Sequence, residues 1–227
     1  MQILITAGGT REYIDTVRFI SNASSGKMGC ALARAAIKAG HKVTLITAPI
    51  TQHPPAAAKI VKVETTIQMF EAVKKYFDRC DCLIMAAAVA DYAPVRSAKT
   101  KLKKSNQQLI IKLKPTPDIL KWAGKNKQLK SKKHALSKAE GGKGKKRILV
   151  GFALEDKAIR CRAEKKLIEK NLDMIVANSP AAIGADKSDV QIKTADSPWI
   201  KIENTTKAAA AKKIICLVEE LNYTKLS

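Results

Sequence analysis

A stretch near the start of the chain, residues 5–29, joins an apolar strand to a helix through glycines and small polar residues. The strand covers residues 2–5, and the helix begins near Lys27. Glycine lets a backbone approach a ligand closely, and the free N–H groups of a helix N-terminus favour negative charge. The pattern therefore predicts a Rossmann-like nucleotide-binding fold in which one of two serines is the helix N-cap. The candidate nucleotide contacts of this stretch are Gly8, Gly9, Ser24, Ser25 and Gly26.

The same stretch lacks the two commonest nucleotide fingerprints. A Walker loop has Ser or Thr after Gly-Lys and a second glycine further upstream, but Met28 and Ser21 stand at those positions. A dinucleotide fold has a compact G-x-G-x-x-G and an acidic residue about 20 residues later. The second expected strand, residues 42–47, instead ends in Ala48 and Pro49. The sequence thus predicts a nucleotide binder that is not a dinucleotide oxidoreductase.

Strand and helix patterns alternate along the 227 residues. This order predicts an α/β fold with a doubly wound, mostly parallel sheet, followed by a C-terminal β-hairpin and helix. The length suits one domain, residues 1–227. The expected strands are residues 2–5, 42–47, 60–63, 81–86, 109–113, 148–152 and 172–177, with the hairpin at 190–194 and 199–202. The expected helices begin near residues 27 and 117 and cover residues 65–76, 156–171 and 206–221.

Two further segments are expected at the carboxyl ends of the strands. Ala86 and Ala87 would let a flat group pack against the backbone, and Asp91 could hold a metal, a nucleotide group or a turn. Thr116 and Pro117 have the chemistry of an N-cap and a first helical residue. A second helix N-terminus is therefore expected beside the ligand.

Lysines recur at spacings that either meet an anion or remain solvated. Lys166 and Lys170 lie four residues apart on one helix flank, where like charges are mildly destabilising. The segment 99–104 is also rich in lysine. Unless an anion binds there, these lysines would protect residues 109–113 as a solvated edge strand. Both alternatives remain open from spacing alone.

The net charge of the chain is +22, and much of the excess lies at residues 125–147. This segment holds ten Lys or Arg residues, one Glu and few large apolar residues, so we expect a basic, mobile insert. The remainder keeps a charge of +13, which fits anionic substrates. A basic nucleic-acid-binding protein is an alternative, but the interleaved aromatic residues of single-strand binders are missing. Specific nucleic-acid binding is therefore not expected.

The five cysteines are scattered and odd in number, which indicates reduced thiols. The first strand begins at residue 2, which leaves no room for a signal peptide. No apolar run approaches the roughly 20 residues that span a bilayer. The chain is expected to be cytoplasmic, without a membrane partner.

Several short phrases occur in a fixed order along the chain: G-G-T-R-E, I-S-N-x-S-S-G-K-M-G, A-A-V-A-D-Y, K-L-K-K, T-P-D-I-L, V-G-F-A-L-E and K-L-x-x-K-x-L-D-x-I-V-A-N. The ordered set resembles the phosphopantothenate–cysteine ligase family of coenzyme A biosynthesis. The resemblance covers nearly the whole chain except the basic insert. Because Met1 directly precedes the first strand, the stand-alone form is expected, with no flavin in this chain.

The resemblance implies a two-step reaction. The carboxylate of 4′-phosphopantothenate attacks the α-phosphorus of CTP, and pyrophosphate leaves. The amine of L-cysteine then attacks the acyl-cytidylate, giving 4′-phosphopantothenoylcysteine and CMP. Mg²⁺ would accompany the nucleotide, held mainly through phosphates, and its protein ligands stay unassigned. Both steps gather negative charge, so fixed donors and cations should dominate catalysis.

The resemblance also implies roles for individual residues. Asn22 matches an asparagine that contacts the activated acyl group, and Lys101 begins the K-x-K-K motif that closes over the nucleotide. Asn178 is a second residue of the substrate side and a candidate reader of the cytosine edge. The remaining nucleotide contacts are Met85, Ala86, Ala87, Asp91, Thr116, Pro117, Asp118, Ile119, Phe152, Lys166 and Lys170. The family often has asparagine where this chain has Thr116, which leaves that contact open.

The family is dimeric, so a homodimer is expected, with residues 109–113 as the contributing strand. A rival resemblance comes from Ser24-Ser25-Gly26-x-x-Gly29, which is similar to the glycine turn of NAD(P)-dependent short-chain dehydrogenases. Those enzymes use a tyrosine with a lysine four residues later. None of the four tyrosines here is followed by lysine at that spacing, which argues against an oxidoreductase.

Overall fold

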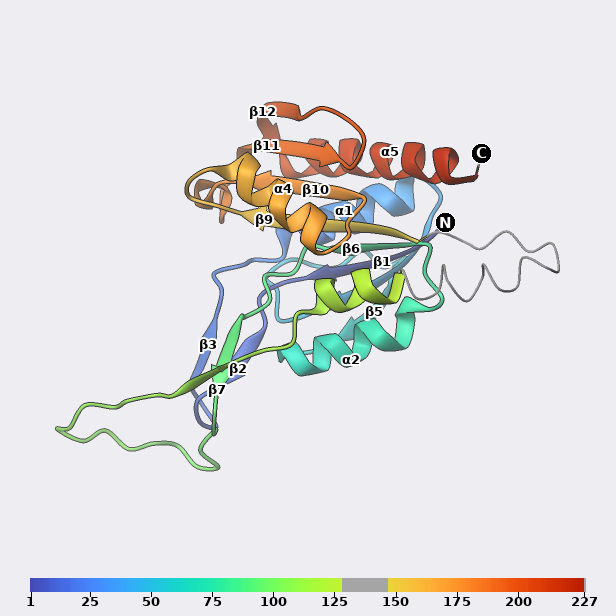
Figure 1. Ribbon diagram of the computed structural model, residues 1–227. Helices are drawn as coiled ribbons and strands as arrows, with labels where there is room; N and C mark the ends of the chain where they lie inside the picture. Colours follow the sequence, from blue (N-terminus) through green and yellow to red (C-terminus); the bar gives the residue numbers. More distant parts are fainter. Residues whose placement is uncertain (128–146, 227) are drawn as a thin grey trace.

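The structure, a computed structural model, describes residues 1–127 and 147–226, and a single eight-stranded sheet runs through its centre (Figure 1). The strand order is β12-β11-β10-β9-β6-β1-β4-β5. The six strands from β10 to β5 are parallel neighbours, and β11 and β12 continue the sheet antiparallel. The bounds are β1 (Gln2–Ala7), β4 (Lys42–Thr47), β5 (Lys59–Lys62), β6 (Cys82–Met85), β9 (Ile148–Leu154), β10 (Met174–Asn178), β11 (Lys187–Thr194) and β12 (Ile200–Thr206). The predicted fold class and the predicted C-terminal hairpin are confirmed.

Helices cover both faces of the sheet. The helices are α1 (Lys27–Lys38), α2 (Thr66–Phe77), α4 (Ile159–Glu169) and α5 (Lys207–Leu226), with a further helical segment at residues 119–127. Alternate residues of each strand point to opposite faces, so Ile3 and Ile5 pack with α1 and α5 while Leu4 packs with α2 and α4. Each fully buried side chain of this kind contributes about 1.5–3 kcal/mol to folding. Two apolar cores therefore hold the sheet.

The helix after β1 begins in a way that differs from the prediction. Its N-cap is Gly26, which has φ +75°, and no side chain caps it, so the predicted serine N-cap is wrong. A Cβ added at Gly26 would lie 2.2 Å from Cγ2 of Ile50, which explains the glycine there. Gly29 in the first turn packs directly on β1, where a Cβ would lie 2.4 Å from the Cβ of Ala7. Both glycines of S-S-G-x-x-G are thus required by packing, and Gly26 also by its backbone conformation.

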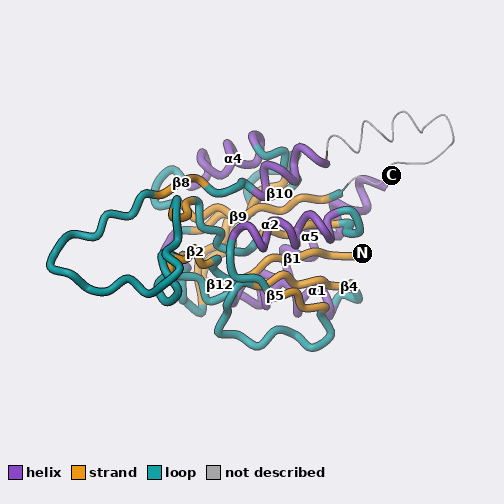
Figure 2. Tube along the Cα trace, turned by 90° about the horizontal axis from the view of Figure 1, so that it is seen from below, coloured by secondary structure: helices purple, strands orange, loops and turns teal. Residues whose placement is uncertain are grey.

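Two short ribbons lie outside the main sheet. One pairs β2 (Arg11–Tyr13) with β3 (Phe19–Ser21), and the other pairs β7 (Tyr92–Pro94) with β8 (Leu113–Pro115). Residues 95–112, called the arm below, leave the second ribbon and reach away from the sheet in Figures 1 and 2. The predicted strand at 109–113 is wrong except for Leu113, because Leu109 and Ile110 are 60% and 80% exposed and pair with no strand among the described residues.

The predicted basic insert begins inside a helix. Residues 125–127 belong to the helical segment, where Lys127 pairs with Asp173 at 2.5 Å, and Arg147 donates to the carbonyl of Cys80 at 3.2 Å. The rest of the prediction, residues 128–146, lies outside the described residues. In the described part of the chain, no helix is both long and apolar enough to cross a bilayer.

Candidate functional site

A cavity of about 570 Å³ opens at the carboxyl ends of the central strands. Chain segments following β1, β6, β9 and β10 line it, and this is where doubly wound sheets bind their ligands. Most of the residues predicted for the site lie in its wall. They are Asn22, Ser24, Ser25, Gly26, Met85, Ala86, Ala87, Asp91, Thr116, Pro117, Asp118, Ile119, Phe152, Lys166, Lys170 and Asn178.

Gly8, Gly9 and Lys101 were predicted for the site but do not line the cavity. A Cβ on Gly8, whose φ is +83°, would lie 2.8 Å from Cγ2 of Ile50, and one on Gly9 would lie 2.6 Å from the carbonyl oxygen of Asn22. The close approach that these glycines permit is therefore to protein atoms. Lys101 is exposed and lies in the arm, which the β7–β8 ribbon carries away from the sheet.

The loop after β6 forms one wall of the cavity and is fixed by backbone and hydroxyl groups. The N–H of Ala88 donates to the carbonyl of Gly8 at 2.9 Å, which continues the pairing of β1 with β6. The N–H of Ala90 donates to Oγ1 of Thr10 at 2.9 Å, and Oγ1 of Thr116 donates to the carbonyl of Ala90 at 2.6 Å. These bonds hold the segment that leads into Asp91. Sequence reasoning missed Thr10, since nothing in its neighbourhood marks a partner 80 residues away.

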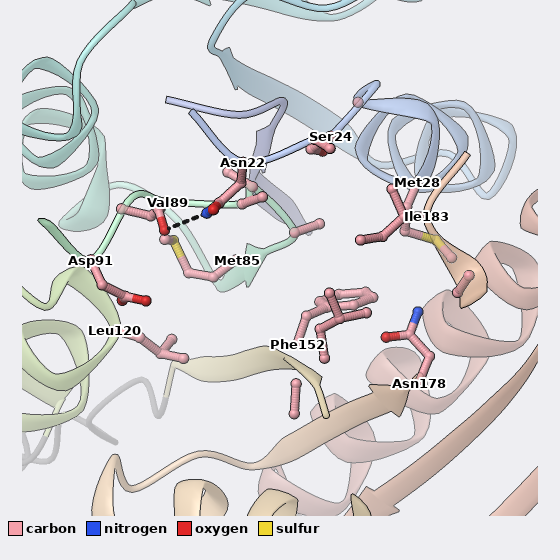
Figure 3. A pocket seen from close by; sticks show the side chains of 18 of the residues that line it. Asn22, Ser24, Met28, Met85, Val89, Asp91, Leu120, Phe152, Asn178 and Ile183 are labelled. Atoms are coloured by element: carbon pink, nitrogen blue, oxygen red, sulfur yellow. Dashed lines mark hydrogen bonds between the residues drawn. The ribbon is translucent and has the colours of Figure 1, made fainter. Parts of the chain in front are cut away.

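Asn22 lies where the first ribbon meets that wall. Its side-chain Nδ2 donates to the carbonyl of Val89 at 3.0 Å, the bond drawn dashed in Figure 3. An amide nitrogen has two donor hydrogens. One of them therefore remains to meet a ligand while the other fixes the side chain.

A cationic group lies beside the first turn of α1. The helix has no acidic residue in that turn, and its N-terminal residues line the cavity. Lys27 pairs with Asp186 at 3.0 Å, and Lys207 donates to the carbonyl of Ala182 at 3.1 Å and to Oγ of Ser188 at 3.2 Å. Burial, and then the nearby Lys27, lower the pKa of Lys207. Sequence reasoning missed both lysines, although Lys27 stands inside the phrase S-S-G-K-M-G.

A second cationic group faces Asp118. Nζ of Lys166 donates to the carbonyl of Phe152 at 2.7 Å, and Nζ of Lys170 pairs with Asp118 at 2.8 Å. Burial, and then Lys170, lower the pKa of Lys166. Burial opposes ionisation of Asp118, but hydrogen bonds from Lys170 and from the N–H of Lys121 hold its pKa below the usual range. The positive charge of the predicted lysine pair is therefore partly balanced by the carboxylate of Asp118.

Asp118 also corrects the predicted start of its helix. Its Oδ1 accepts the N–H of Lys121 at 2.8 Å, and the helical residues begin at 119. Thr116, the predicted N-cap, instead bonds the loop after β6. Asp118 is therefore the capping residue, and its second carboxylate oxygen is the partner of Lys170.

Part of the cavity wall is apolar. Figure 3 shows Met28 and Ile183 on one side, Met85 on the other, and Phe152 with Asn178 below the open space. The amide of Asn178, at the end of β10, points toward that space. A flat polar ring could lie against Phe152 while Asn178 meets its edge.

The same wall offers few ligands for a metal ion. Within residues 1–127 and 147–226, no three His, Cys, Asp or Glu side chains gather into a group that could hold an ion. The carboxylate of Asp91 faces the cavity. The donor set fits a divalent cation that takes most of its oxygens from a bound polyphosphate, as Mg²⁺ does in many nucleotide sites.

Comparison with known proteins gives one family match over residues 1–221, described as the DNA/pantothenate metabolism flavoprotein C-terminal domain. The coenzyme A biosynthesis bifunctional protein CoaBC of Bacillus subtilis is 44% identical over 184 residues, which is 81% of this chain and 41% of that protein. The chain spans only 41% to 56% of the lengths of the first curated relatives that it matches.

Solved structures share the fold. The C-terminal domain of a coenzyme A biosynthesis bifunctional protein CoaBC is 35% identical, with a TM-score of 0.77, covering 97% of this chain and 94% of that one. A Cab2 mutant, solved in complex with phosphopantothenate-cysteine, is 16% identical with a TM-score of 0.75, over 99% of this chain and 87% of that one. The second likeness concerns the fold alone.

Proposed function

This chain belongs to the family of the DNA/pantothenate metabolism flavoprotein C-terminal domain, and on that premise we propose that it is a phosphopantothenate–cysteine ligase. The family predicted from the ordered sequence phrases is confirmed. The reaction proposed for this chain joins 4′-phosphopantothenate to L-cysteine and converts CTP to CMP and pyrophosphate.

One observation carries the proposal. Motif residues that lie far apart in the sequence, from Asn22 to Asn178, converge on one cavity at the carboxyl ends of β1, β6, β9 and β10. The cavity has two cationic groups, with Lys27 and Lys207 near α1, and Lys166 in α4 with Lys170 directly after that helix. This arrangement suits two phosphate-bearing substrates held side by side, because phosphate charges are stabilised by fixed cations and helix N-termini.

The proposed chemistry forms and breaks one bond at each step. A carboxylate oxygen of 4′-phosphopantothenate attacks the α-phosphorus of CTP, and the bond from that phosphorus to the bridging oxygen breaks as pyrophosphate leaves. The cysteine amine then attacks the acyl carbon and loses a proton, and CMP leaves with the former acyl–phosphate oxygen. The free N–H of Asn22 would stabilise the acyl oxygen in both steps.

The nucleotide would lie across the apolar part of the wall. Phe152 would pack against the base, and Asn178 with the backbone of Ala86 would meet its polar edge. Mg²⁺, when bound, would screen the phosphate charges, with Asp91 as one of the carboxylates in the wall. Lys101, which the arm carries, would contact the phosphates.

We also propose that the enzyme is a homodimer. The arm and its ribbon expose Tyr92, Val95, Leu109, Ile110 and Leu113. Exposed apolar side chains at a ribbon edge are typical of an interface. Ultracentrifugation at working concentration tests the dimer, and a monomer mass would contradict it.

A cytoplasmic location is proposed together with this function. Cys161 and Cys216 are exposed free thiols, and such thiols are typical of a reducing compartment. Fractionation of the producing cell tests the location.

The reaction is tested by pyrophosphate release in the presence of 4′-phosphopantothenate, cysteine and Mg²⁺, with CTP compared with ATP. Release that needs both phosphopantothenate and CTP supports the ligase and the choice of nucleotide. Release with ATP but not with CTP supports the ligase function and contradicts the proposal that the nucleotide is CTP. No release with either nucleotide contradicts the proposed function.

A further inference from the structure

One buried carboxylate outside the cavity has an unusual number of partners. Asp15 lies in the turn between β2 and β3 and is 1% exposed. Its Oδ1 accepts the N–H groups of Val17 and Arg18, both at 2.8 Å. Its Oδ2 accepts Nε of Arg18 at 2.9 Å and forms an ion pair with the same guanidinium at 2.6 Å. The turn is therefore organised around this one side chain.

The same carboxylate and guanidinium hold the arm. The N–H of Leu102 donates to Oδ2 of Asp15 at 3.0 Å, and Nη2 of Arg18 donates to the carbonyl oxygen of Leu102. Nearby, the N–H of Ala98 donates to the carbonyl of Ile14 at 2.9 Å. We call Asp15, Arg18 and the main chain of Leu102 the arm clamp.

The clamp divides the arm at Leu102 into a fastened part before it and an exposed part after it. Residues 98–102 are tied to the first ribbon, whereas Leu109 and Ile110 further along are 60% and 80% exposed. Fixing the base of a loop shortens the segment that is free to move and reduces the entropy lost when its tip is ordered. Lys101 is the last residue before the clamped Leu102, so the clamp fixes the peptide unit that follows it.

The electrostatics favour a persistent contact. The hydrogen bond from the backbone of Arg18 is the largest influence on Asp15. Together with the N–H groups of Val17 and Leu102, it holds the pKa of Asp15 well below the usual range, against the opposing effect of burial. The carboxylate is therefore charged at any pH at which the enzyme would work. Charge-assisted hydrogen bonds of this kind are about twice as strong as neutral ones.

We propose that Asp15 is a positioning residue for Lys101, and that the arm clamp sets the direction from which this lysine approaches the nucleotide. The inference rests on the proposed function, in which Lys101 acts on the phosphates. Asp15 itself lies outside the cavity wall and touches no substrate. Its effect on turnover would be exerted wholly through the arm.

The first test measures hydrogen exchange at the Leu102 amide in the full-length protein without substrate. Asp15→Asn keeps the volume of the side chain but removes the charge and one acceptor oxygen. We expect the Leu102 amide to exchange at least about tenfold faster, as expected for loss of a hydrogen bond to a charged group. Asp189→Asn is the matched control, since Asp189 also accepts a backbone N–H, from Asn204, but in the distant β11–β12 hairpin. Unchanged exchange at Leu102 in Asp15→Asn would overturn the clamp.

The second test separates positioning from a merely structural role by a double-mutant cycle. Asp15→Asn should lower kcat at least about tenfold in the wild-type background and cause no further loss in a Lys101→Gln background. If the fold-loss of kcat in the double variant equals the product of the two single losses, Asp15 acts independently of Lys101 and the proposal is overturned. Should Asp15→Asn fail to fold, Arg18→Lys serves instead, because it removes the guanidinium from the Leu102 carbonyl and leaves the carboxylate in place.

The two tests also separate this inference from the proposed function. Exchange at Leu102 reports on the clamp even in a protein without ligase activity. If Asp15→Asn exchanges faster at Leu102 but the wild-type protein releases no pyrophosphate, the clamp stands, and both the ligase function and the positioning of Lys101 are overturned. An active wild type whose turnover is unaffected by Asp15→Asn would overturn the positioning alone.

Discussion

The sheet and the arm of this protein are held by different forces. The sheet lies between two apolar cores, and side chains such as Leu83 and Ile84 in β6 are completely buried. The arm has exposed apolar side chains and is fastened at its base by a carboxylate and a guanidinium. The cavity opens at the carboxyl ends of the strands, and most of its wall comes from the loops and helices that follow them.

The difference shows how stability and function are divided. Apolar burial is non-directional and large in sum, so it can fix a scaffold. A few charged hydrogen bonds contribute less free energy but define a direction, so they can orient a mobile segment. Substitutions in the sheet should therefore change folding, and substitutions in the arm should change turnover.

The largest effect is expected in the sheet. Leu83→Ala should lower the free energy of unfolding by about 2–5 kcal/mol, because it removes buried methyl groups and leaves a cavity between α2 and the sheet. Urea denaturation followed by circular dichroism measures the change. A loss of unfolding free energy below about 1 kcal/mol would contradict the difference between sheet and arm, because the buried site would then be no more sensitive to substitution than an exposed one.

At the boundary of the two regions, Asn22→Asp should leave the fold intact and lower turnover by about 100- to 1,000-fold. The new carboxylate would repel the negative charge that develops on the acyl oxygen, so the reaction should stop near the acyl-cytidylate. Quenched-flow detection of that intermediate, with overall turnover, measures this effect. Normal turnover would remove Asn22 from the mechanism.

In the arm, Lys101→Gln should lower turnover by about 100-fold, since it removes one fixed cation from the phosphates. The urea midpoint should stay the same because the side chain is exposed. Lys112→Gln, in the same arm but away from the clamp, is the matched control and should remain active. Unchanged steady-state rates in Lys101→Gln would refute its role.

Acid should weaken the arm clamp through Asp15. The pKa of Asp15 is lowered in the folded protein, so its contribution to stability is present above the unfolded value of about 3.9 and is lost as the pH falls through the folded value. The difference in unfolding free energy between wild type and Asp15→Asn should be constant from about pH 5 to about pH 7, where the group is ionised in both states, and should narrow below about pH 4. Urea titrations at several pH values measure it. A difference that grows on acidification would contradict this sign.

The smallest effect is expected in the part of the arm that leads back to β8. Ile110→Ser should change the free energy of unfolding by less than about 0.5 kcal/mol, because the side chain is 80% exposed. In the proposed dimer, the same substitution should weaken self-association. Urea denaturation at low protein concentration and ultracentrifugation at high concentration separate the two effects.

The main sheet could be predicted from sequence because its strands carry strong apolar patterns. Residues 42–47 were predicted and observed as β4 with the same bounds. The same logic failed at residues 109–113, where a similar apolar pattern has no neighbour to pair with. The ribbon of β2 and β3 was missed because R-E-Y and F-I-S are too short to show a period.

Sequence analysis identified most residues of the site but not the contacts between them. Motif phrases indicated Asp118 and Lys170, but their ion pair depends on how a helix at 119–127 and α4 approach each other. The arm clamp could not be predicted from the sequence, because Asp15 and Leu102 are 87 residues apart and their hydrogen bond involves a main-chain N–H. Backbone partners of that kind leave no mark in residue identity.

Both ends of the described chain lie on the side of the molecule opposite the arm (Figures 1 and 2). The direction of the strands explains this, since β1 begins at the end of the sheet opposite the cavity and runs toward the cavity, while α5 starts with Lys207 in the cavity wall and runs back. A surface tether, an affinity tag or a fused module attached at either end would therefore face away from the substrates. The fold is suited to immobilisation or to modular fusion without hindering access to its site.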